Sequence, residues 1–426
     1  MVFLINRASL CPMKLVRHLL LLWGAVITIQ PAQGELPSGP CARSFSIEQI
    51  RATALNSSPL VAEIDAAFAG ELGRAFNTEV LENPELGADH AFAANHIRGD
   101  NDPNTQFILS QPLRLSNFGA RDRVASLIRK AGDNQKGRQL LEFTQKISLQ
   151  FYSLGVLQRM KRVLTKAEER AAEKVALVRK SVQEGLLSEG DEKLLEGERY
   201  RLLSQRKGVE VSILVMQGEL ARTAGLSCYP SVTEAAKMPG IPAETVLIDK
   251  AENSQFNENT RAEILLNLAH EQTRLADLDA FPRFAPGIIY QHTNDGGDFV
   301  GGSLTISVPV WNRNQGNRGQ AVGEQVSARR KREFLASGGF QTQVRIQRAA
   351  SVTAIERAEL FSSKAVPAFE LALANQERLF SAGRGSVVEV WQTFRTYNDA
   401  QIEGLSLWLE AATKRIELSL LVGEEV

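Results

Sequence analysis

The sequence has few residues that could build a metal site or a disulfide framework. Only 3 cysteines and 5 histidines occur among 426 residues, which leaves few ligands for a Cys/His metal centre and excludes a disulfide-dense scaffold. An excess of charge of one sign is also lacking, because Lys+Arg and Asp+Glu both number 49. A nucleic-acid-binding protein normally carries a basic excess that neutralises phosphates, so the balance argues against that class.

Sequence motifs of catalysis are lacking as well. We find no phosphate-binding loop, no G-x-S-x-G elbow and no H-E-x-x-H motif. His90, His96, His270 and His292 do not pair at the spacing of metal ligands on a helix. We therefore expect a protein that is not an enzyme and that has no metal site and no cofactor.

Long apolar runs are absent outside the N-terminus, so any membrane contact must be made by something other than helices. At the N-terminus, Lys14, Arg17 and His18 precede an apolar run over residues 19–29, and the small-residue triplet Ala32-Gln33-Gly34 follows. This order predicts a secretory signal peptide over residues 1–34. A short N-terminal anchor helix is the alternative.

Cleavage after residue 34 removes Cys11 and leaves Cys41 and Cys228. Two remaining cysteines can pair in an oxidising compartment, so a Cys41–Cys228 disulfide is one expectation. Lipidation of Cys41 is the other, although the residues before it form a poor lipobox. Neither outcome would carry the function.

Three clusters of residues occur twice, at a constant spacing of about 198 residues. They are Asn83-Pro84 with Phe281-Pro282, then Pro112, Gly119 and Arg121 with Pro309, Gly316 and Arg318, and finally Gly185, Ser188 and Asp191 with Gly383, Ser386 and Glu389. We interpret the chain as a tandem duplication. The predicted parts are an N-terminal extension at 35–58, a first repeat at 59–224, an inter-repeat linker at 225–259 and a second repeat at 260–426.

Each repeat is expected to contain a helix, two strands and a long helical hairpin, so the fold is mainly α with a small β part. The predicted helices span 59–82 and 260–280, and the predicted strands span 86–97, 105–115, 284–292 and 299–310. Long apolar periodicity predicts helices over 119–184, 188–224, 316–382 and 386–421. Gly338-Gly339 and Pro367 predict a bend in the third of these.

The segment 299–310 has the clearest strand pattern. Its apolar residues alternate with small polar ones, and Leu304, Ile306 and Val308 share one face. About 11 tilted residues cross a bilayer in an outer-membrane barrel. If these residues face lipid, four strands cannot close a barrel alone and copies of the chain must complete it. The alternative is a water-soluble four-stranded sheet beside a coiled coil.

The chain resembles the TolC-like outer-membrane efflux protein family over nearly the whole mature sequence. The segments that carry the resemblance are Asn83-Pro84-Glu85-Leu86, Gln111-Pro112-Leu113, residues 308–317, and the turns at 184–188 and 382–390. Within the family, Arg313-Asn314-Gln315-Gly316 is most similar to the branch that serves heavy-metal efflux pumps of the cobalt–zinc–cadmium type.

The resemblance implies a trimer in the outer membrane of a Gram-negative bacterium. Four strands from each chain would complete a 12-stranded β-barrel, and the helices would form a coiled-coil α-barrel extending into the periplasm. A periplasmic adaptor protein and an inner-membrane efflux transporter are the implied partners, and heavy-metal cations are a candidate substrate. The rival expectation is a soluble periplasmic coiled-coil adaptor without a pore.

The resemblance also implies roles for the two turns between long helices. Glu389 matches an acidic position at the constricted tunnel mouth, where three copies would favour cations; Gln392 follows at a position that is acidic in the best-known member. A solvated helix glutamate is the alternative. Adaptor docking is implied for Gly185, Leu186, Leu187, Ser188, Gly383, Arg384, Gly385 and Ser386, which can equally be read as helix stops and N-caps.

Overall fold

A computed structural model describes residues 39–91, 104–233, 241–293 and 297–423. The predicted signal peptide at 1–34 lies outside the described residues, as does His96. None of the helices in the described ranges is both long enough and apolar enough to cross a lipid bilayer.

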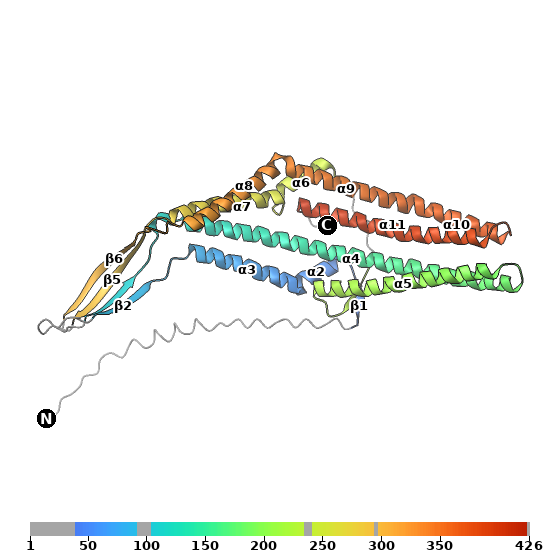
Figure 1. The fold of residues 1–426 in the computed structure, drawn as a ribbon, viewed down its shortest axis with the longest axis horizontal. Helices are drawn as coiled ribbons and strands as arrows, with labels where there is room; N and C mark the ends of the chain where they lie inside the picture. The colour runs from blue at the N-terminus through green and yellow to red at the C-terminus, as the bar shows by residue number, and fades with distance from the viewer. Residues whose placement is uncertain (1–38, 92–103, 234–240, 294–296, 424–426) are drawn as a thin grey trace, which may run out of the picture. The chain divides into compact units, whose positions relative to one another are not determined.

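The same order of elements occurs twice along the chain (Figure 1). A helix is followed by two strands and then by long antiparallel helices. The first set is α3 Pro59–Glu79, β2 Glu85–Ala91, β3 Asn104–Ser110, α4 Ala120–Gln183 and α5 Glu189–Ala224. The second set is α7 Glu258–Leu278, β5 Arg283–Thr293, β6 Asp298–Ser307, α8 Gln315–Phe334, α9 Phe340–Leu360, α10 Val366–Ser381 and α11 Val387–Val422.

The longest helix, α4, has 64 residues, or about 96 Å at 1.5 Å per residue. No proline interrupts it, and a glycine with positive φ precedes it and another ends its last turn, Gly119 and Gly185. Its buried seam includes Ile147, Phe151 and Leu154, which pack against α5 and the N-terminal elements. The connection from β3 precedes α4, and the turn to α5 follows it. The length of α4 therefore separates the sheet from that turn.

The second long run is divided by two π-helical segments, Leu335–Gly339 and Phe361–Ala365. Gly338 has φ 94°, a conformation that residues with a Cβ rarely adopt, so the predicted bend at Gly338-Gly339 is confirmed. Pro367 follows the second segment. A proline has no N–H and its ring clashes with the carbonyl four residues earlier, which accounts for a widened turn there.

The segment predicted as an irregular linker is partly regular, and that prediction was wrong. It contains the short strand β4 Tyr229–Val232 and the helix α6 Glu244–Asn253. β4 pairs in parallel with β1 Pro40–Phe45, which precedes α2 Ile47–Ser57. The partner of β4 lies far away in the sequence, so the local pattern gives no sign of the pairing.

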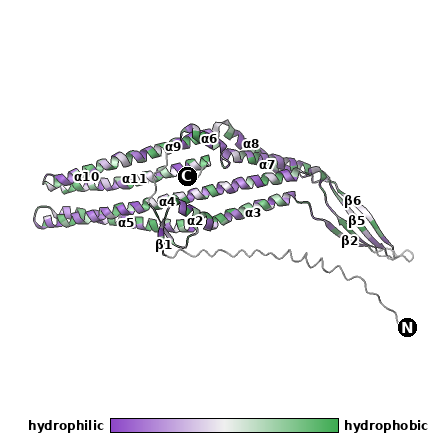
Figure 2. Ribbon diagram, turned by 180° about the vertical axis from the view of Figure 1, so that it is seen from behind, coloured by the Kyte–Doolittle hydropathy of each residue, from purple (hydrophilic) through white to green (hydrophobic). Residues whose placement is uncertain are grey.

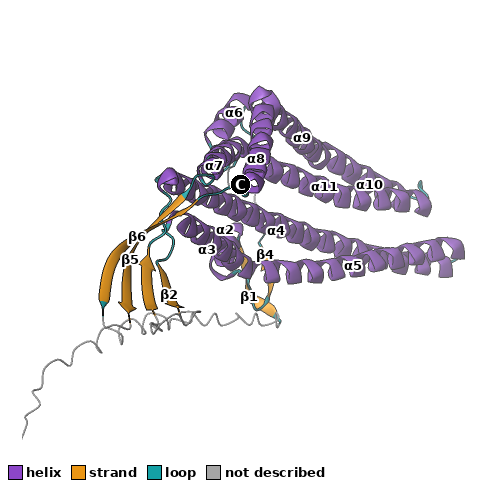
Figure 3. Ribbon diagram, turned by 60° about the vertical axis from the view of Figure 1, so that its left-hand side comes forward, coloured by secondary structure: helices purple, strands orange, loops and turns teal. Residues whose placement is uncertain are grey.

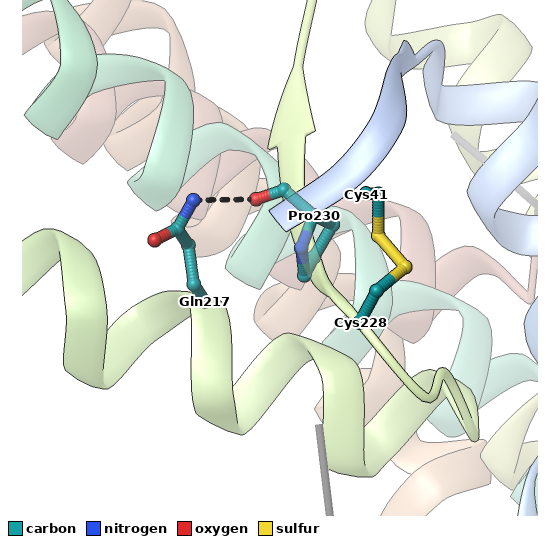
Figure 4. The surroundings of a disulfide bond; sticks show 4 residues. All are labelled: Cys41, Gln217, Cys228 and Pro230. Carbon is teal, nitrogen blue, oxygen red and sulfur yellow. Dashed lines mark hydrogen bonds between the residues drawn. A yellow bond between two sulfur atoms is a disulfide. The ribbon is translucent and has the colours of Figure 1, made fainter. Parts of the chain in front are cut away.

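A disulfide connects Cys41 in β1 with Cys228, the residue just before β4 (Figure 4). Cys41 and Cys228 are bonded, with their Cα atoms 5.0 Å apart, so the sulfur of Cys41 is not free to carry a lipid. Beside the bond, the Gln217 side-chain amide donates a hydrogen bond of 2.8 Å to the carbonyl of Pro230. The N-terminal segment is thereby fastened to the end of the first repeat.

Neighbouring elements follow one order in every layer of the fold. The sheet order is β2-β3-β5-β6, and the helices attached to these strands pack in the matching order α3-α4-α7-α8. Beyond them the order is α5-α4-α11, with α9 and α10 packed on α11. Figure 3 shows the sheet as a single layer that continues into the helices. Each layer ends in an element with no neighbour on its outer side among the described residues.

Candidate functional site

The sheet is antiparallel throughout, and its register places whole rows of side chains on one face. His90 pairs with Thr105, Thr105 with His292, and His292 with Asp298. Directly paired residues on neighbouring strands lie on the same face of a sheet, and so do residues two positions apart on one strand. The row of paired residues that contains His90, and every second row counted from it, therefore define face A. The intervening rows define face B.

Face A is apolar and exposed. Its members include Leu86, Phe107, Leu109, Ile288, Tyr290, Val300, Leu304 and Ile306, all of them exposed. Val300 is 76% exposed and Leu304 is 62% exposed. A water-soluble sheet buries its apolar face against another layer, and no such layer covers this one among the described residues. Polar residues on this face lie in the row that ends the strands, which holds His90, His292 and Asp298.

Face B is more polar and less exposed. It carries Glu85, Asp89, Gln106, Gln291, Ser303, Thr305 and Ser307, together with the apolar Ile108, Ile289 and Phe299. From Ala285 to Thr293 in β5, the side chains of this face are half-buried while those of face A are exposed. The strands therefore mix strongly apolar and strongly polar residues, as Figure 2 shows.

Two strands end earlier than the sequence predicts. Ser307, the last residue of β6, pairs with Arg283, the first of β5. Pro282 and Pro309 have no N–H to extend the ladder past this pair. Val308 was predicted on a lipid-facing strand, but it lies one residue beyond β6, so this part of the prediction was wrong. β3 likewise ends at Ser110 instead of continuing to Leu115.

Large apolar side chains surround the points where strands pass into helices. Trp311 is 90% exposed and Phe118 is 81% exposed. Leu81, Leu115 and Phe281 are also exposed, so each connection between a strand and a helix contributes at least one such residue. These residues flank the strand ends that carry face A.

A polar network fixes three of these connections, and the sequence analysis did not find it. The Arg114 guanidinium contacts the Glu82 carboxylate at 2.8 Å and the Asp279 carboxylate at 3.0 Å. The Asn117 amide donates a 2.6 Å hydrogen bond to Asp279. These residues come from the α3–β2, β3–α4 and α7–β5 connections. Their spacing along the chain carries no periodic signal, so only the fold brings them together.

The fourth connection, between β6 and α8, contains the segment Arg313-Asn314-Gln315-Gly316. Asn314 has φ 60°, which asparagine tolerates better than most residues. Its side-chain amide donates a 2.9 Å hydrogen bond to the carbonyl of Ala276. The Arg313 N–H donates to the Gln315 side chain at 2.7 Å. These contacts give the segment a role in shaping the start of α8.

The two turns between long helices have the same construction. Gly185 and Gly383 have φ 74° and 73°. The N–H of Gly185 bonds the carbonyl of Val182, and that of Leu186 bonds Ser181. The equivalent bonds run from Gly383 and Arg384 to Phe380 and Leu379. Each turn is thus a Schellman motif that satisfies the last carbonyls of its helix.

A capping box starts each returning helix. Ser188 and Asp191 exchange hydrogen bonds at the start of α5, and Ser386 and Glu389 do so at the start of α11. The backbone N–H of Glu389 donates to the Ser386 hydroxyl at 3.1 Å. Glu389 therefore has a structural role as a cap, and its side chain and that of Gln392 remain exposed.

The two turns differ in their apolar residues. Leu186 is 72% exposed, whereas Leu187 packs on the cluster formed by α4, α5, α10 and α11. The second turn has Gly385 in the place of Leu187, and a Cβ there would lie 3.2 Å from the backbone nitrogen of Phe380. The first turn therefore presents one free apolar side chain, and the second presents Arg384.

An ion-pair network joins the two returning helices just behind the turns. Arg201 and Glu198 of α5 pair at 2.6 Å. Arg395 of α11 contacts Glu198 at 3.5 Å, and Arg201 contacts Asp399 of α11 at 3.8 Å. Within the described ranges, no group of three or more His, Cys, Asp or Glu side chains could hold a metal ion.

No protein-family model matches the sequence, and no curated protein matches it. Solved structures do match. VceC, an outer membrane protein of Vibrio cholerae, has 15% identity and a TM-score of 0.74 over 89% of this chain and 96% of its own. CusC, studied for folding and transmembrane channel formation, has 14% identity and a TM-score of 0.73 over 92% and 96%.

A third match is CmeC, an outer membrane channel of Campylobacter jejuni, with 13% identity and a TM-score of 0.71 over 88% of this chain and 85% of its own. At identities this low, the likeness establishes the fold alone. These matches confirm the fold that the sequence resemblance implied. This chain has the fold of the TolC-like outer-membrane channels.

Proposed function

We propose that the protein is the outer-membrane channel of a tripartite efflux system, a passive export conduit built from three copies of the chain. The observation that carries the proposal is face A, an exposed apolar face on a sheet whose outer strands, β2 and β6, each have one edge without a paired strand among the described residues. In lipid such a face is favourable, but open edges are not. Copies of the chain must therefore pair with these edges.

The helices support the same closure. The edge helices α3 and α8 carry exposed apolar residues, among them Phe76 and Val326, and so do α5 and α10, among them Val211 and Leu371. Because the edges of sheet and helices coincide, one kind of contact between copies would cover all of them. Such head-to-tail contacts close into a ring.

The dimensions fit a membrane barrel. β5 has 11 residues, which span about 36 Å at ~3.3 Å per residue and about 28 Å when tilted by ~40°. The apolar band of an outer-membrane barrel is about 25 Å tall. Four strands per chain exclude closure by one copy, since the smallest such barrels have about eight strands. Three copies give the 12 strands that the resemblance implies.

The finer parts of the proposal concern partners and cargo. The two turns, with Leu186 and Arg384 exposed, are the proposed docking points for a periplasmic adaptor, which would link the channel to an inner-membrane efflux transporter. A heavy-metal cation is the proposed cargo. The exposed carboxylate of Glu389 would favour cations if the residue lies at the tunnel mouth, as the resemblance implies. The segment at 313–316 is weaker support for a heavy-metal cargo, because the contacts of Arg313 and Asn314 give these residues a structural role at the start of α8.

Charged substitutions on the two faces of β6 test the proposal. Leu304→Arg and Ile306→Arg place a charge on face A, and Thr305→Arg, at an exposed position, is the matched control on face B. We expect the face A variants to reduce strongly the recovery of a heat-sensitive trimer from outer membranes, since an arginine that faces lipid costs about 2–4 kcal/mol at the bilayer midplane. The control should assemble and give conductance in planar bilayers.

The opposite outcome would favour the soluble adaptor. A wild-type chain that stays monomeric in buffer without detergent, with face A variants that behave like the wild type, would overturn the proposal. Light scattering after gentle extraction distinguishes the two states.

A further inference from the structure

A cleft between α4, α10 and α11 has features that a conduit wall does not require. Its volume is about 790 Å³, within the ~300–1,000 Å³ usual for small-molecule sites. α11 contributes Tyr397, Gln401, Leu405 and Trp408 to the lining. These residues recur every three or four positions and so lie on one face of the helix.

Cations line the cleft from α4. Arg159, Arg162, Lys166 and Arg170 recur at intervals of three or four residues, which places them in a row along the helix. Glu370 of α10 is the one carboxylate among the lining residues. Like charges at this spacing repel one another, so the row favours an anion that lies against it.

Two of these cations form no salt bridge within the described residues. Among the described residues, Lys166 and Arg170 form no ion pair. Other cations on the same helix do, since Lys161 pairs with Glu210 at 3.1 Å and Lys174 with Glu377 at 3.1 Å.

The part of the lining that comes from α11 combines the aromatic residues Tyr397 and Trp408 with polar ones. The Arg159 guanidinium lies 5.9 Å from the centre of the Trp408 ring. Burial raises the pKa of the Tyr397 hydroxyl, which keeps the group protonated and able to donate a hydrogen bond at neutral pH. A ligand here would meet the rings of Tyr397 and Trp408 together with the cations of α4.

We propose that this cleft binds a small anionic ligand that carries an aromatic ring, with its charged group at Lys166 and Arg170 and its ring against Trp408 and Leu405. The cations favour the negative charge, and the aromatic residues favour a flat apolar body over a bare inorganic anion. The site does not depend on the channel function.

Calorimetric titration of the full-length protein in detergent tests the site, with 2-naphthalenesulfonate as the probe. We expect saturable binding that the double variant Lys166→Gln/Arg170→Gln weakens at least tenfold. Lys207→Gln, which removes an exposed lysine of α5 outside the cleft, should bind like the wild type. A cationic probe of the same size, 2-naphthylmethylammonium, should bind much more weakly.

A gain of affinity provides a second test that a folding defect cannot imitate. Glu370→Gln removes the carboxylate of the cleft and should tighten binding several-fold at low salt, and the difference should shrink as salt screens the charges. Equal affinities for the wild type and the double variant, or no saturable binding by the wild type, would overturn the proposal.

Discussion

Single residues set the geometry of both turns. Gly185 and Gly383 hold positive φ values that let each long helix end in a Schellman motif. Ser188 and Ser386 then cap the returning helices, with Asp191 and Glu389 as reciprocal partners. A cap and a tunnel-mouth carboxylate are compatible roles for one glutamate, because the capping contacts leave its side chain exposed.

Replacing Gly185 by alanine should lower the stability of the first turn. The left-handed conformation costs a residue with a Cβ about 1–2 kcal/mol. Gly197→Ala is the matched control in the same hairpin, because Gly197 lies inside α5 with open space around its Cα; it should be neutral or slightly stabilising. Hydrogen exchange of the amides at 181–191 measures the difference. Equal exchange in both variants would contradict this role for Gly185.

At the scale of elements, ion pairs join helices that apolar contacts bring together. Arg179 of α4 contacts Glu192 and Glu196 of α5 at 2.7 and 2.6 Å, close to the first turn. Exposed pairs of this kind contribute little singly and more as a network. The network at Arg201 and Arg395 connects the two hairpins in the same way.

The contacts of Glu196 should make the first hairpin sensitive to acid. Hydrogen bonds from Lys193 and then Arg179 hold the pKa of its carboxyl below the usual 4.5. A lowered folded-state pKa means that the pairing stabilises the hairpin above pH 4.5 and is lost as the pH falls through the lower folded value. We expect proteolysis near residues 179–196 to accelerate as the pH falls below 4.5.

Glu196→Gln is the control for this pH dependence. The variant cannot lose a carboxylate charge at position 196, so its cleavage rate should change less between pH 6 and pH 3.5 than that of the wild type. An acid-stable protease such as pepsin, corrected for its own pH profile on an unfolded substrate, gives the measurement. The same pH response in both proteins would show that other groups are responsible.

At the scale of the whole molecule, the proposed trimer would make each chain one sector of a ring. Strands and helices keep one order from layer to layer, and every outer edge carries exposed apolar side chains. The Cys41–Cys228 disulfide and the β1–β4 pair close the first repeat upon itself. The first repeat is therefore cross-linked within a single chain.

Removal of the disulfide should destabilise the sector without changing its fold. The bond spans 187 residues of sequence, and closing so long a loop is worth up to about 5 kcal/mol of chain entropy. Cys41→Ser/Cys228→Ser should lower the melting temperature of the extracted protein, and a reducing agent should lower that of the wild type alone. A double variant that melts like the oxidised wild type would contradict this account.

The sequence alone determined the succession of elements, the bend at Gly338-Gly339 and the caps at Ser188 and Ser386, because helix and strand periodicity and glycine or serine at helix ends are local signals. Only the tertiary structure decided the β1–β4 pair, the Arg114 network and the end of β6 at Ser307. These depend on groups that are distant in sequence. Whether Ser307 ends a strand depends on where its partner begins, and no local pattern contains that information.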